Sequence, residues 1–308
     1  MTGLPDGLNA VGAPSGATSG ATSAATWLVI TLLLVACGRP TAPPVATDEP
    51  ALRIVALSPH LVELAFAAGA GPQLVGAVEF SDEPTAARAL PRVGDAFRLD
   101  LEALAATRPD LILGWPSGNS PATLDRLRRL GYRVVELEPR RLADVGDQIE
   151  AIGRLAGTEV PARKAASAWR EGLAALQAQY QDARPGRVFY QIAPRPLMTV
   201  NREHFIGQAI ELCGGENIYA AVPGLTPVVS VESVVVAAPD VIVASDYTRG
   251  SGSPASGSPL DHWRPWKQLP AVADDRLHLI DPDLMSVPGP RLLAGITQLC
   301  AALNEPGL

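Results

Sequence analysis

The chain has few of the residues on which metal and nucleic-acid binding usually depend. It contains four histidines and three cysteines in 308 residues, and aromatic residues make up 5%. No histidine has another at the spacing of a metal site, so a zinc or manganese centre would need ligands from distant segments. The formal net charge is −7, and the arginines are dispersed instead of forming a basic face. We therefore expect neither a metal site nor a nucleic-acid partner.

The short motifs of common catalytic and nucleotide-binding sites are also missing. The sequence has no G-x-x-x-x-G-K-[ST] loop, no G-x-S-x-G elbow and no H-E-x-x-H helix. We expect no enzyme activity and no cofactor. An enzyme with two lobes similar to those of nitrogenase is a distant alternative, because it would need a cofactor fingerprint that the sequence lacks.

The N-terminal region has no apolar run long enough to cross a bilayer as a helix. Its apolar run, Trp27–Ala36, is too short. The run ends in Leu-Val-Ala-Cys37-Gly, which resembles the lipobox of bacterial lipoproteins. In that family the signal is removed and the cysteine carries lipid. We therefore expect a signal and disordered N-terminus over 1–36, and a lipidated Cys37 with a linker over 37–51. The protein would then be periplasmic and anchored to a bacterial membrane.

Two alternatives to this interpretation of the N-terminus stay open. No Lys or Arg precedes Arg39, although export signals usually begin with positive charge, so the signal is atypical or the start codon lies elsewhere. The apolar run could instead be a short buried segment.

Two cysteines remain once Cys37 is assigned to lipid. Cys213 and Cys300 each lie at the end of a helix-like apolar pattern. An even pair in an exported chain predicts a disulfide, which would join two helices of the second half of the chain. Two buried free thiols are the alternative.

A thirteen-residue stretch occurs twice without a gap, at 101–113 and 231–243, with an offset of 130 residues (232 minus 102). Each copy predicts a short helix that opens on a glutamate, stops at a Pro-Asp turn and leads into a buried strand. The offset is far longer than the roughly 20 to 50 residues of a solenoid repeat. We therefore predict two similar lobes with a ligand-binding cleft between them.

Strands and helices alternate through both halves, which predicts an α/β fold with parallel sheets covered by helices. We place an N-terminal lobe at 52–158, a connecting helix at 159–184 and a C-terminal lobe at 185–308. Pro161 fits the first turn of the connecting helix, and one apolar stripe runs along it. A single helix of about twenty residues is roughly 30 Å long and stiff, so we do not expect large hinge closure. The other predicted strands are 53–57, 74–78, 132–136, 187–190 and 277–280, and the other predicted helices are 61–68, 205–212 and 291–303.

Three segments, 58–69, 108–115 and 211–218, resemble the periplasmic substrate-binding proteins of ABC importers, and among these the cobalamin-binding (BtuF-like) group. The similarity covers about residues 53–303. It implies two Rossmann-like lobes joined by one long helix, a monomer that holds vitamin B12 or a related corrinoid in the cleft, and delivery to a permease dimer with its ATPase subunits. A ferric-siderophore or haem receptor of the same fold is the nearest alternative.

The resemblance also gives the repeated glutamates a role. In the family, one acidic residue on each lobe pairs with arginines of the permease, and the matching residues are Glu102 and Glu232. A two-lobed protein that faces a two-fold symmetric partner needs one anchor per lobe, at equivalent positions. The alternative is that each glutamate only stabilises the first turn of its helix.

The ligand-binding residues follow mainly from the same resemblance. A corrinoid has a flat ring with apolar edges and amide arms, so its cleft needs aromatic walls and a few polar groups. Ala96 stands where the family has tryptophan, and the neighbouring Phe97 could compensate. The predicted ligand-binding residues are Phe80, Phe97, Trp115, Met198, Tyr247 and Asp283.

Overall fold

The computed structural model describes residues 52–245 and 257–306. These described residues form one compact unit. The predicted lipidation site, Cys37, and the predicted ligand-binding residue Tyr247 lie outside the described residues. Within the described ranges, no helix has the length and apolarity that crossing a membrane requires.

The first half of the described chain forms a lobe around one parallel sheet, with the strand order β2-β1-β3-β4. The strands are β1 (Ile54–Ala56), β2 (Leu74–Ala77), β3 (Leu111–Gly114) and β4 (Val134–Glu136). The helices are α1 (Pro59–Ala67), α2 (Leu101–Ala106), α3 (Pro121–Arg129) and α4 (Asp144–Ala156), with short 3-10 helices η1 (Gly71–Gln73) and η2 (Thr85–Ala89).

The second half repeats this architecture, with a parallel sheet in the order β10-β9-β5-β8 and a small antiparallel hairpin, β6-β7. The strands are β5 (Arg187–Gln191), β6 (Ala193–Pro194), β7 (Leu197–Met198), β8 (Glu216–Asn217), β9 (Val241–Ser245) and β10 (Leu277–Ile280). The helices are α6 (Phe205–Leu212), α7 (Val231–Ala237), α8 (Pro270–Ala273), α9 (Pro282–Met285) and α10 (Leu292–Leu303), with the 3-10 helix η4 (Asp261–Trp263).

Local sequence signals explain where the predicted helices begin and end. Ser58 caps α1, because its hydroxyl accepts a hydrogen bond from the Leu61 N–H at 3.4 Å, and Pro59 occupies the first turn. Gly69, just after α1, has a φ of +80°, which a side chain would disfavour. The helix therefore starts at Pro59, directly after the cap and two residues before the predicted 61.

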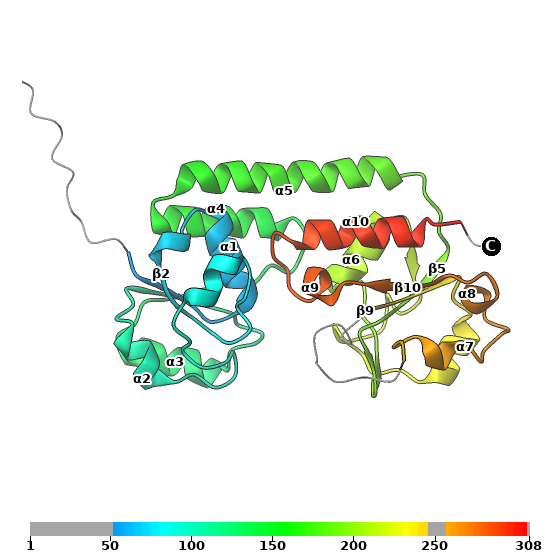
Figure 1. Ribbon diagram of the computed structural model, residues 1–308, viewed down its shortest axis with the longest axis horizontal. Coiled ribbons are helices and arrows are strands. Elements are labelled where there is room, and N and C mark those ends of the chain that lie inside the picture. The colour runs from blue at the N-terminus through cyan, green and yellow to red at the C-terminus, as the bar shows by residue number, and fades with distance from the viewer. Residues whose placement is uncertain (1–51, 246–256, 307–308) are drawn as a thin grey trace, which may run out of the picture. The chain divides into compact units, whose positions relative to one another are not determined.

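The connecting helix is α5 (Glu159–Tyr180), which runs along one side of both lobes, at the top of Figure 1. Its predicted apolar stripe faces the protein: Trp169 and Leu176 are buried. The Trp169 indole N–H also donates to the carbonyl of Leu142 at 2.8 Å. The predicted α/β fold, with two parallel-sheet lobes joined by one long helix, is confirmed.

Alternate residues of each central strand pack into different cores. In β1, Ile54 and Ala56 point to a core shared with α5, whereas Val55 points to a separate core on the other face of the sheet. The strands of the second lobe divide in the same way between the shared core and a third core. The shared core contains residues of both lobes and of α5, so the lobes are held together by continuous apolar packing as well as by the helix. This packing supports a stiff connection.

The duplicated motif has the same structure in both lobes. In the first copy the Asp110 carboxylate accepts a hydrogen bond from the Arg53 N–H at 2.9 Å, and in the second the Asp240 carboxylate accepts one from the Arg187 N–H at 2.7 Å. Each aspartate therefore ties its strand to the start of the first strand of its lobe. Arg108 and Ala238, also 130 residues apart, both have left-handed backbone conformations, with φ of 46° and 45°. The two copies therefore share the same hydrogen bond from their aspartate and the same left-handed residue in the turn.

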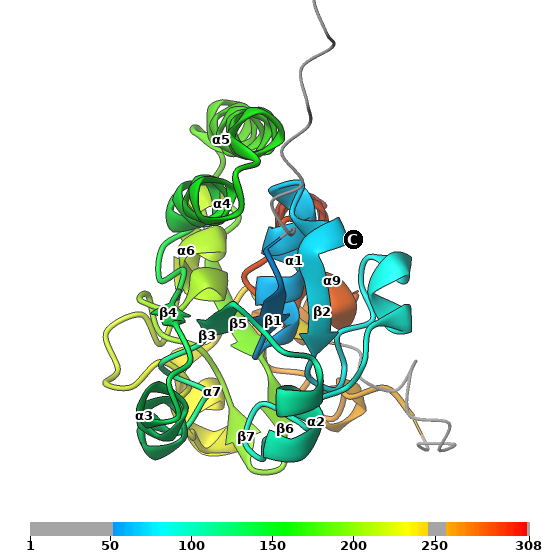
Figure 2. The same ribbon diagram turned by 90° about the vertical axis from the view of Figure 1, so that its left-hand side faces the viewer.

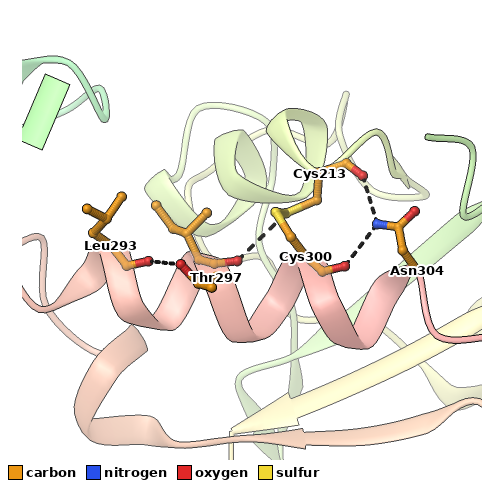
Figure 3. The surroundings of a disulfide bond; sticks show 6 residues. Cys213, Leu293, Thr297, Cys300 and Asn304 are labelled. Atoms are coloured by element: carbon orange, nitrogen blue, oxygen red, sulfur yellow. Dashed lines mark hydrogen bonds between the residues drawn. A yellow bond between two sulfur atoms is a disulfide. The ribbon is translucent and has the colours of Figure 1, made fainter. Parts of the chain in front are cut away.

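Cys213 and Cys300 form a disulfide that joins the end of α6 to α10 (Figure 3), and the pairing predicted from the sequence is present. Their Cα atoms lie 4.8 Å apart, and both residues are fully buried. The Asn304 side-chain amide donates to the carbonyls of Cys213 (3.3 Å) and Cys300 (2.9 Å), so it ties the same two helix ends together.

Candidate functional site

Two adjoining cavities lie between the lobes. The larger, which we call the apolar cavity, has a volume of about 560 Å³, and the smaller, the polar cavity, about 380 Å³. They share Pro59 of the first lobe with Ser286 and Val287 of the second. The apolar cavity is further lined by His60, Trp115, Ser117, Glu138, Pro139, Arg140, Glu203, His204, Phe205, Leu225 and Pro288, and the polar cavity by Glu63, Phe80, Ser81, Asp82, Glu83, Arg88, Asp283 and Arg291.

Trp115 forms part of the first-lobe wall of the apolar cavity because it directly follows β3. Its backbone N–H donates to the Asn119 side-chain oxygen at 2.7 Å, and the buried Asn119 amide in turn donates to the carbonyl of Leu57 at 3.0 Å. Gly118 lets the loop pass under the indole, since a Cβ there would lie 2.0 Å from the ring. The loop after β3 is thus built to hold this tryptophan at the carboxyl end of the sheet, where ligands of α/β folds usually bind.

His60 packs against Trp115 in the same wall. The two rings meet edge to face with centroids 5.2 Å apart. His60 is 1% exposed, and its Nδ1 lies 2.8 Å from the Ser58 hydroxyl oxygen. Burial lowers the pKa of His60 to about 3, so the ring is neutral at pH 7. It buttresses the tryptophan as an uncharged ring.

His204 faces the same cavity from the second lobe. It precedes α6, and its Nδ1 accepts a hydrogen bond from the Ile206 N–H at 3.1 Å, which caps the helix. Its ring stacks on Phe205 with centroids 4.3 Å apart. Burial lowers the pKa of His204 to about 4, so this ring is also neutral at pH 7. The apolar cavity therefore has uncharged aromatic and heteroaromatic rings on both sides.

The two cleft histidines make stability depend on pH. Their unfolded pKa is near 6.5, so between about pH 6.5 and 4 the unfolded chain binds protons that the native protein does not. We expect the free energy of unfolding to be constant with respect to these groups above about pH 7.5 and to fall progressively as the pH drops through 6.5. Each histidine contributes up to about 1.4 kcal/mol per pH unit. Urea unfolding at pH 7, 6 and 5 measures this slope.

His60→Asn and His204→Asn provide the controls for that experiment. Each substitution should remove one titrating group, so the slope of unfolding free energy against pH should decrease by up to about 1.4 kcal/mol per pH unit, whatever the effect of the substitution on stability at pH 7. A slope equal to that of the native protein in both variants would contradict the assignment.

The polar cavity carries most of the charge of the cleft. Phe80 lies on its rim and is 81% exposed, with a left-handed φ of 64°. The buried Ser81 hydroxyl, which also lines this cavity, has no hydrogen-bond partner among the described residues. Across the two cavities the lining has six carboxylates and three arginines, and both histidines are neutral. The cleft is therefore net acidic, and it has beside it a buried hydroxyl without a partner among the described residues.

An ion pair joins the lobes at the polar cavity. Arg291, next to α10, donates two hydrogen bonds to the Glu63 carboxylate of α1, at 2.8 and 3.2 Å. The Glu63 side chain is 5% exposed and that of Arg291 is 34% exposed. The pair raises the pKa of the Arg291 guanidinium. Two-point contact and burial make this a stronger link than a surface ion pair.

We expect the Glu63–Arg291 pair to contribute to stability through mutual coupling. In a double-mutant cycle of Glu63→Gln, Arg291→Gln and the double variant, the coupling energy should be about 1 to 2 kcal/mol, measured by urea unfolding. The neighbouring pair Glu83–Arg88, at 3.4 Å with the arginine 59% exposed, is the matched control and should give less than about 1 kcal/mol. Equal coupling for the two pairs would refute the special role of the buried one.

The structure brings together some of the residues predicted to bind ligand. Trp115 lines the apolar cavity, and Phe80 and Asp283 line the polar one. Phe97 is 74% exposed and Met198 lies in the β6-β7 hairpin, and neither lines either of these cavities.

Sequence reasoning missed three rings of the apolar cavity, namely His60, His204 and Phe205. His60 stands directly after the Ser-Pro turn that follows β1, a position at the carboxyl edge of the sheet that could have marked it. No comparable signal marks His204, whose place in the wall depends on how the second lobe packs against the first. The described residues also contain no group of three or more His, Cys, Asp or Glu that could hold a metal ion.

The two repeated glutamates occupy equivalent exposed places. Glu102 is the second residue of α2 and Glu232 the second residue of α7. Figures 1 and 2 show both helices on the side of the unit opposite α5. Hydrogen bonding to its own backbone N–H and to Ser230 lowers the pKa of Glu232. Both glutamates are exposed and their helices lie on one face, and Glu232 also has the geometry of a helix-start residue.

Comparison with known proteins gives consistent matches. The model of the family described as periplasmic binding protein matches residues 54–284. The vitamin B12-binding protein of Vibrio cholerae is 35% identical over 279 residues, which cover 90% of this chain and 98% of that protein.

Solved structures of periplasmic binding proteins are similar to this chain in fold. The crystal structure of the periplasmic vitamin B12-binding protein BtuF of Vibrio cholerae has a TM-score of 0.73 and 36% identity, covering 82% of this chain and 97% of that one. A periplasmic haem-binding protein of Pseudomonas aeruginosa has a TM-score of 0.69 and 27% identity, covering 83% of this chain and 94% of that one. The named proteins in these matches are binding proteins, not enzymes.

Proposed function

Because this chain belongs to the periplasmic binding protein family, we propose that it captures cobalamin or a related corrinoid in the cleft between its lobes and delivers it to the permease of an ABC importer. Its activity is binding and release, with no catalytic step and no cofactor. The family places the protein in the periplasm.

The observation that carries this proposal is the composition of the apolar cavity. A corrin ring is broad and flat, with apolar edges. Trp115 on one lobe, packed against the buried His60, and His204 and Phe205 on the other supply uncharged ring surfaces against which such a ligand can pack. The adjoining polar cavity, with the unpartnered Ser81 hydroxyl, suits the amide arms.

The charge of the cleft favours a corrinoid over haem. The amide arms of a corrinoid are neutral, whereas haem carries two propionates. Six lining carboxylates against three arginines repel an anionic ligand, because like charges in a partly desolvated cleft are costly to bring together. Glu63 also neutralises Arg291, so the arginines available to a propionate are fewer still.

Delivery requires a docking face, and Glu102 and Glu232 support one. Each is exposed, each opens the repeated helix of its lobe, and both helices lie on one side of the unit. Arginines on two permease subunits would pair with them, one per lobe. We further propose that the chain is a monomer tethered through lipid on Cys37, with residues 37–51 as the linker.

Calorimetric titration of the purified protein with cyanocobalamin, haemin and a ferric hydroxamate siderophore tests the proposed cargo. We expect saturable one-to-one binding of cyanocobalamin and no comparable binding of the other two. Tight binding of haemin or the siderophore, with no heat from cyanocobalamin, would overturn the proposal.

A further inference from the structure

His204 is fixed in one tautomer by its role as a helix cap. The Ile206 backbone N–H donates to Nδ1 at 3.1 Å, so Nδ1 must present its lone pair. A neutral imidazole then carries its hydrogen on Nε2. The ring cannot turn over without losing the cap of α6, and it also stacks on Phe205 with centroids 4.3 Å apart.

The Nε2–H of His204 is free to bind a ligand. No hydrogen bond joins Nε2 to any described residue, and the side chain lines the apolar cavity. The backbone that carries it is held as well, because the Asn201 side-chain oxygen accepts hydrogen bonds from the N–H groups of Glu203 (3.0 Å) and His204 (3.1 Å). The cleft therefore contains one rigidly placed, uncharged N–H donor on its second-lobe wall.

We propose that His204 is a specificity-determining residue whose Nε2–H donates to a carbonyl oxygen of an amide arm of the corrinoid, and that it does not coordinate the cobalt. This inference rests on the proposed function and names the protein group that fixes the orientation of the corrin ring in the cleft. Coordination is disfavoured because the lone pair of Nδ1 is used by the helix cap and Nε2 holds the hydrogen. His60 is no substitute, because it is 1% exposed and its ring nitrogens lie 2.8 and 3.3 Å from the Ser58 hydroxyl.

The acceptor is a neutral amide carbonyl and not a carboxylate. A neutral donor alone would bind either group. Glu138 and Glu203 line the same cavity, and Arg140 is its only lining arginine, so a carboxylate would meet net repulsion there whereas an amide would not. His204 thus adds orientation to a cavity whose charge already selects against anions.

The test replaces the donor and keeps the cap. In His204→Asn the amide oxygen can accept the Ile206 N–H, since Asn is a good cap, but the shorter side chain cannot reach the ligand as Nε2 does. We expect the Kd for cyanocobalamin to rise about fivefold to tenfold, the effect of one lost neutral hydrogen bond. His204→Ser, another good cap, should behave in the same way. The thermal midpoint of both variants should stay close to that of the native protein.

His262→Asn is the matched control. His262 lies beside a tryptophan of the same lobe, Trp263, at a centroid distance of 4.7 Å, but lines neither cavity. The Kd of the His262→Asn variant for cyanocobalamin should equal that of the native protein. Native-like affinity in both cap-preserving variants at position 204 would overturn the inference.

The visible spectrum of bound aquocobalamin separates donation from coordination. Replacement of the cobalt-bound water by imidazole shifts the corrin bands, so we expect no such shift on binding to the native protein. An imidazole-type shift in the native protein that is lost in His204→Asn would also overturn the inference. If the native protein bound no corrinoid at all, the proposed function itself would fail, which is distinguishable from unchanged affinity in the variants.

Discussion

Replacing both Glu102 and Glu232 by arginine is expected to abolish cobalamin uptake and to leave ligand affinity unchanged. The two side chains are exposed and come from equivalent helix positions, and neither lines a cavity of the cleft. With the charge reversed at both positions, each new arginine would face the proposed arginine of a permease subunit. The resulting repulsion would disfavour docking of both lobes. Uptake of labelled cyanocobalamin into vesicles that contain the cognate permease should fall to the level without binding protein.

A second double variant controls for the change of net charge. Glu171→Arg with Asp182→Arg alters the net charge by the same amount, but Glu171 lies on α5, opposite α2 and α7, and Asp182 follows the end of α5. This variant should transport normally. Loss of cyanocobalamin binding in the Glu102/Glu232 variant, or equal loss of transport in the control, would refute the docking role. Normal transport in the Glu102/Glu232 variant would leave the glutamates as helix-start residues only.

Removing the disulfide is expected to cause the largest loss of stability. The bond links residues 87 apart in sequence, and closing a loop of that length restricts the unfolded chain by about 4 kcal/mol. Cys213→Ala with Cys300→Ala should lower the free energy of unfolding by about that amount and the thermal midpoint by roughly 10 °C. Both sulfur atoms lie in a fully buried region, so alanine adds no polar group.

Reduction of the native protein provides the control for the disulfide experiment. Dithiothreitol should destabilise the native protein by a similar amount and should not affect the double alanine variant. A variant as stable as the oxidised native protein would show that packing of α6 on α10, together with Asn304, suffices without the bond.

The repeat shows how far local sequence determines this fold. The helix, Pro-Asp turn and strand of each copy depend on neighbours within about a dozen residues, so the pattern predicted them correctly. The hydrogen bonds from Asp110 and Asp240 to the first strand of each lobe join residues 57 and 53 apart, and the pattern contains no direct sign of them. Local signals therefore gave the elements, while the ties between them became visible only in the folded chain.

The cleft was less predictable than the fold. Trp115 could be predicted because it follows a strand at the carboxyl edge of the sheet, where ligands of α/β folds usually bind, and because it matches a cleft tryptophan of the family that the sequence resembles. His204 was overlooked because its neighbours in the wall, Trp115 and His60, belong to the other lobe, and because its capping role is set by a hydrogen bond to Ile206. Phe97 shows the converse: it is aromatic and stands next to a position where the family has tryptophan, yet it is 74% exposed and lines neither cavity.

The central claim is that the cleft between the lobes holds the corrinoid, and titration of cyanocobalamin into the native protein and Trp115→Ala tests it most directly. Trp115 lines the apolar cavity, and removing its ring deletes apolar surface from the cavity wall. We expect saturable binding by the native protein and at least about tenfold weaker binding by the variant, measured at a temperature where both proteins are folded. No binding by the native protein, or equal affinity in the two proteins, would contradict the account.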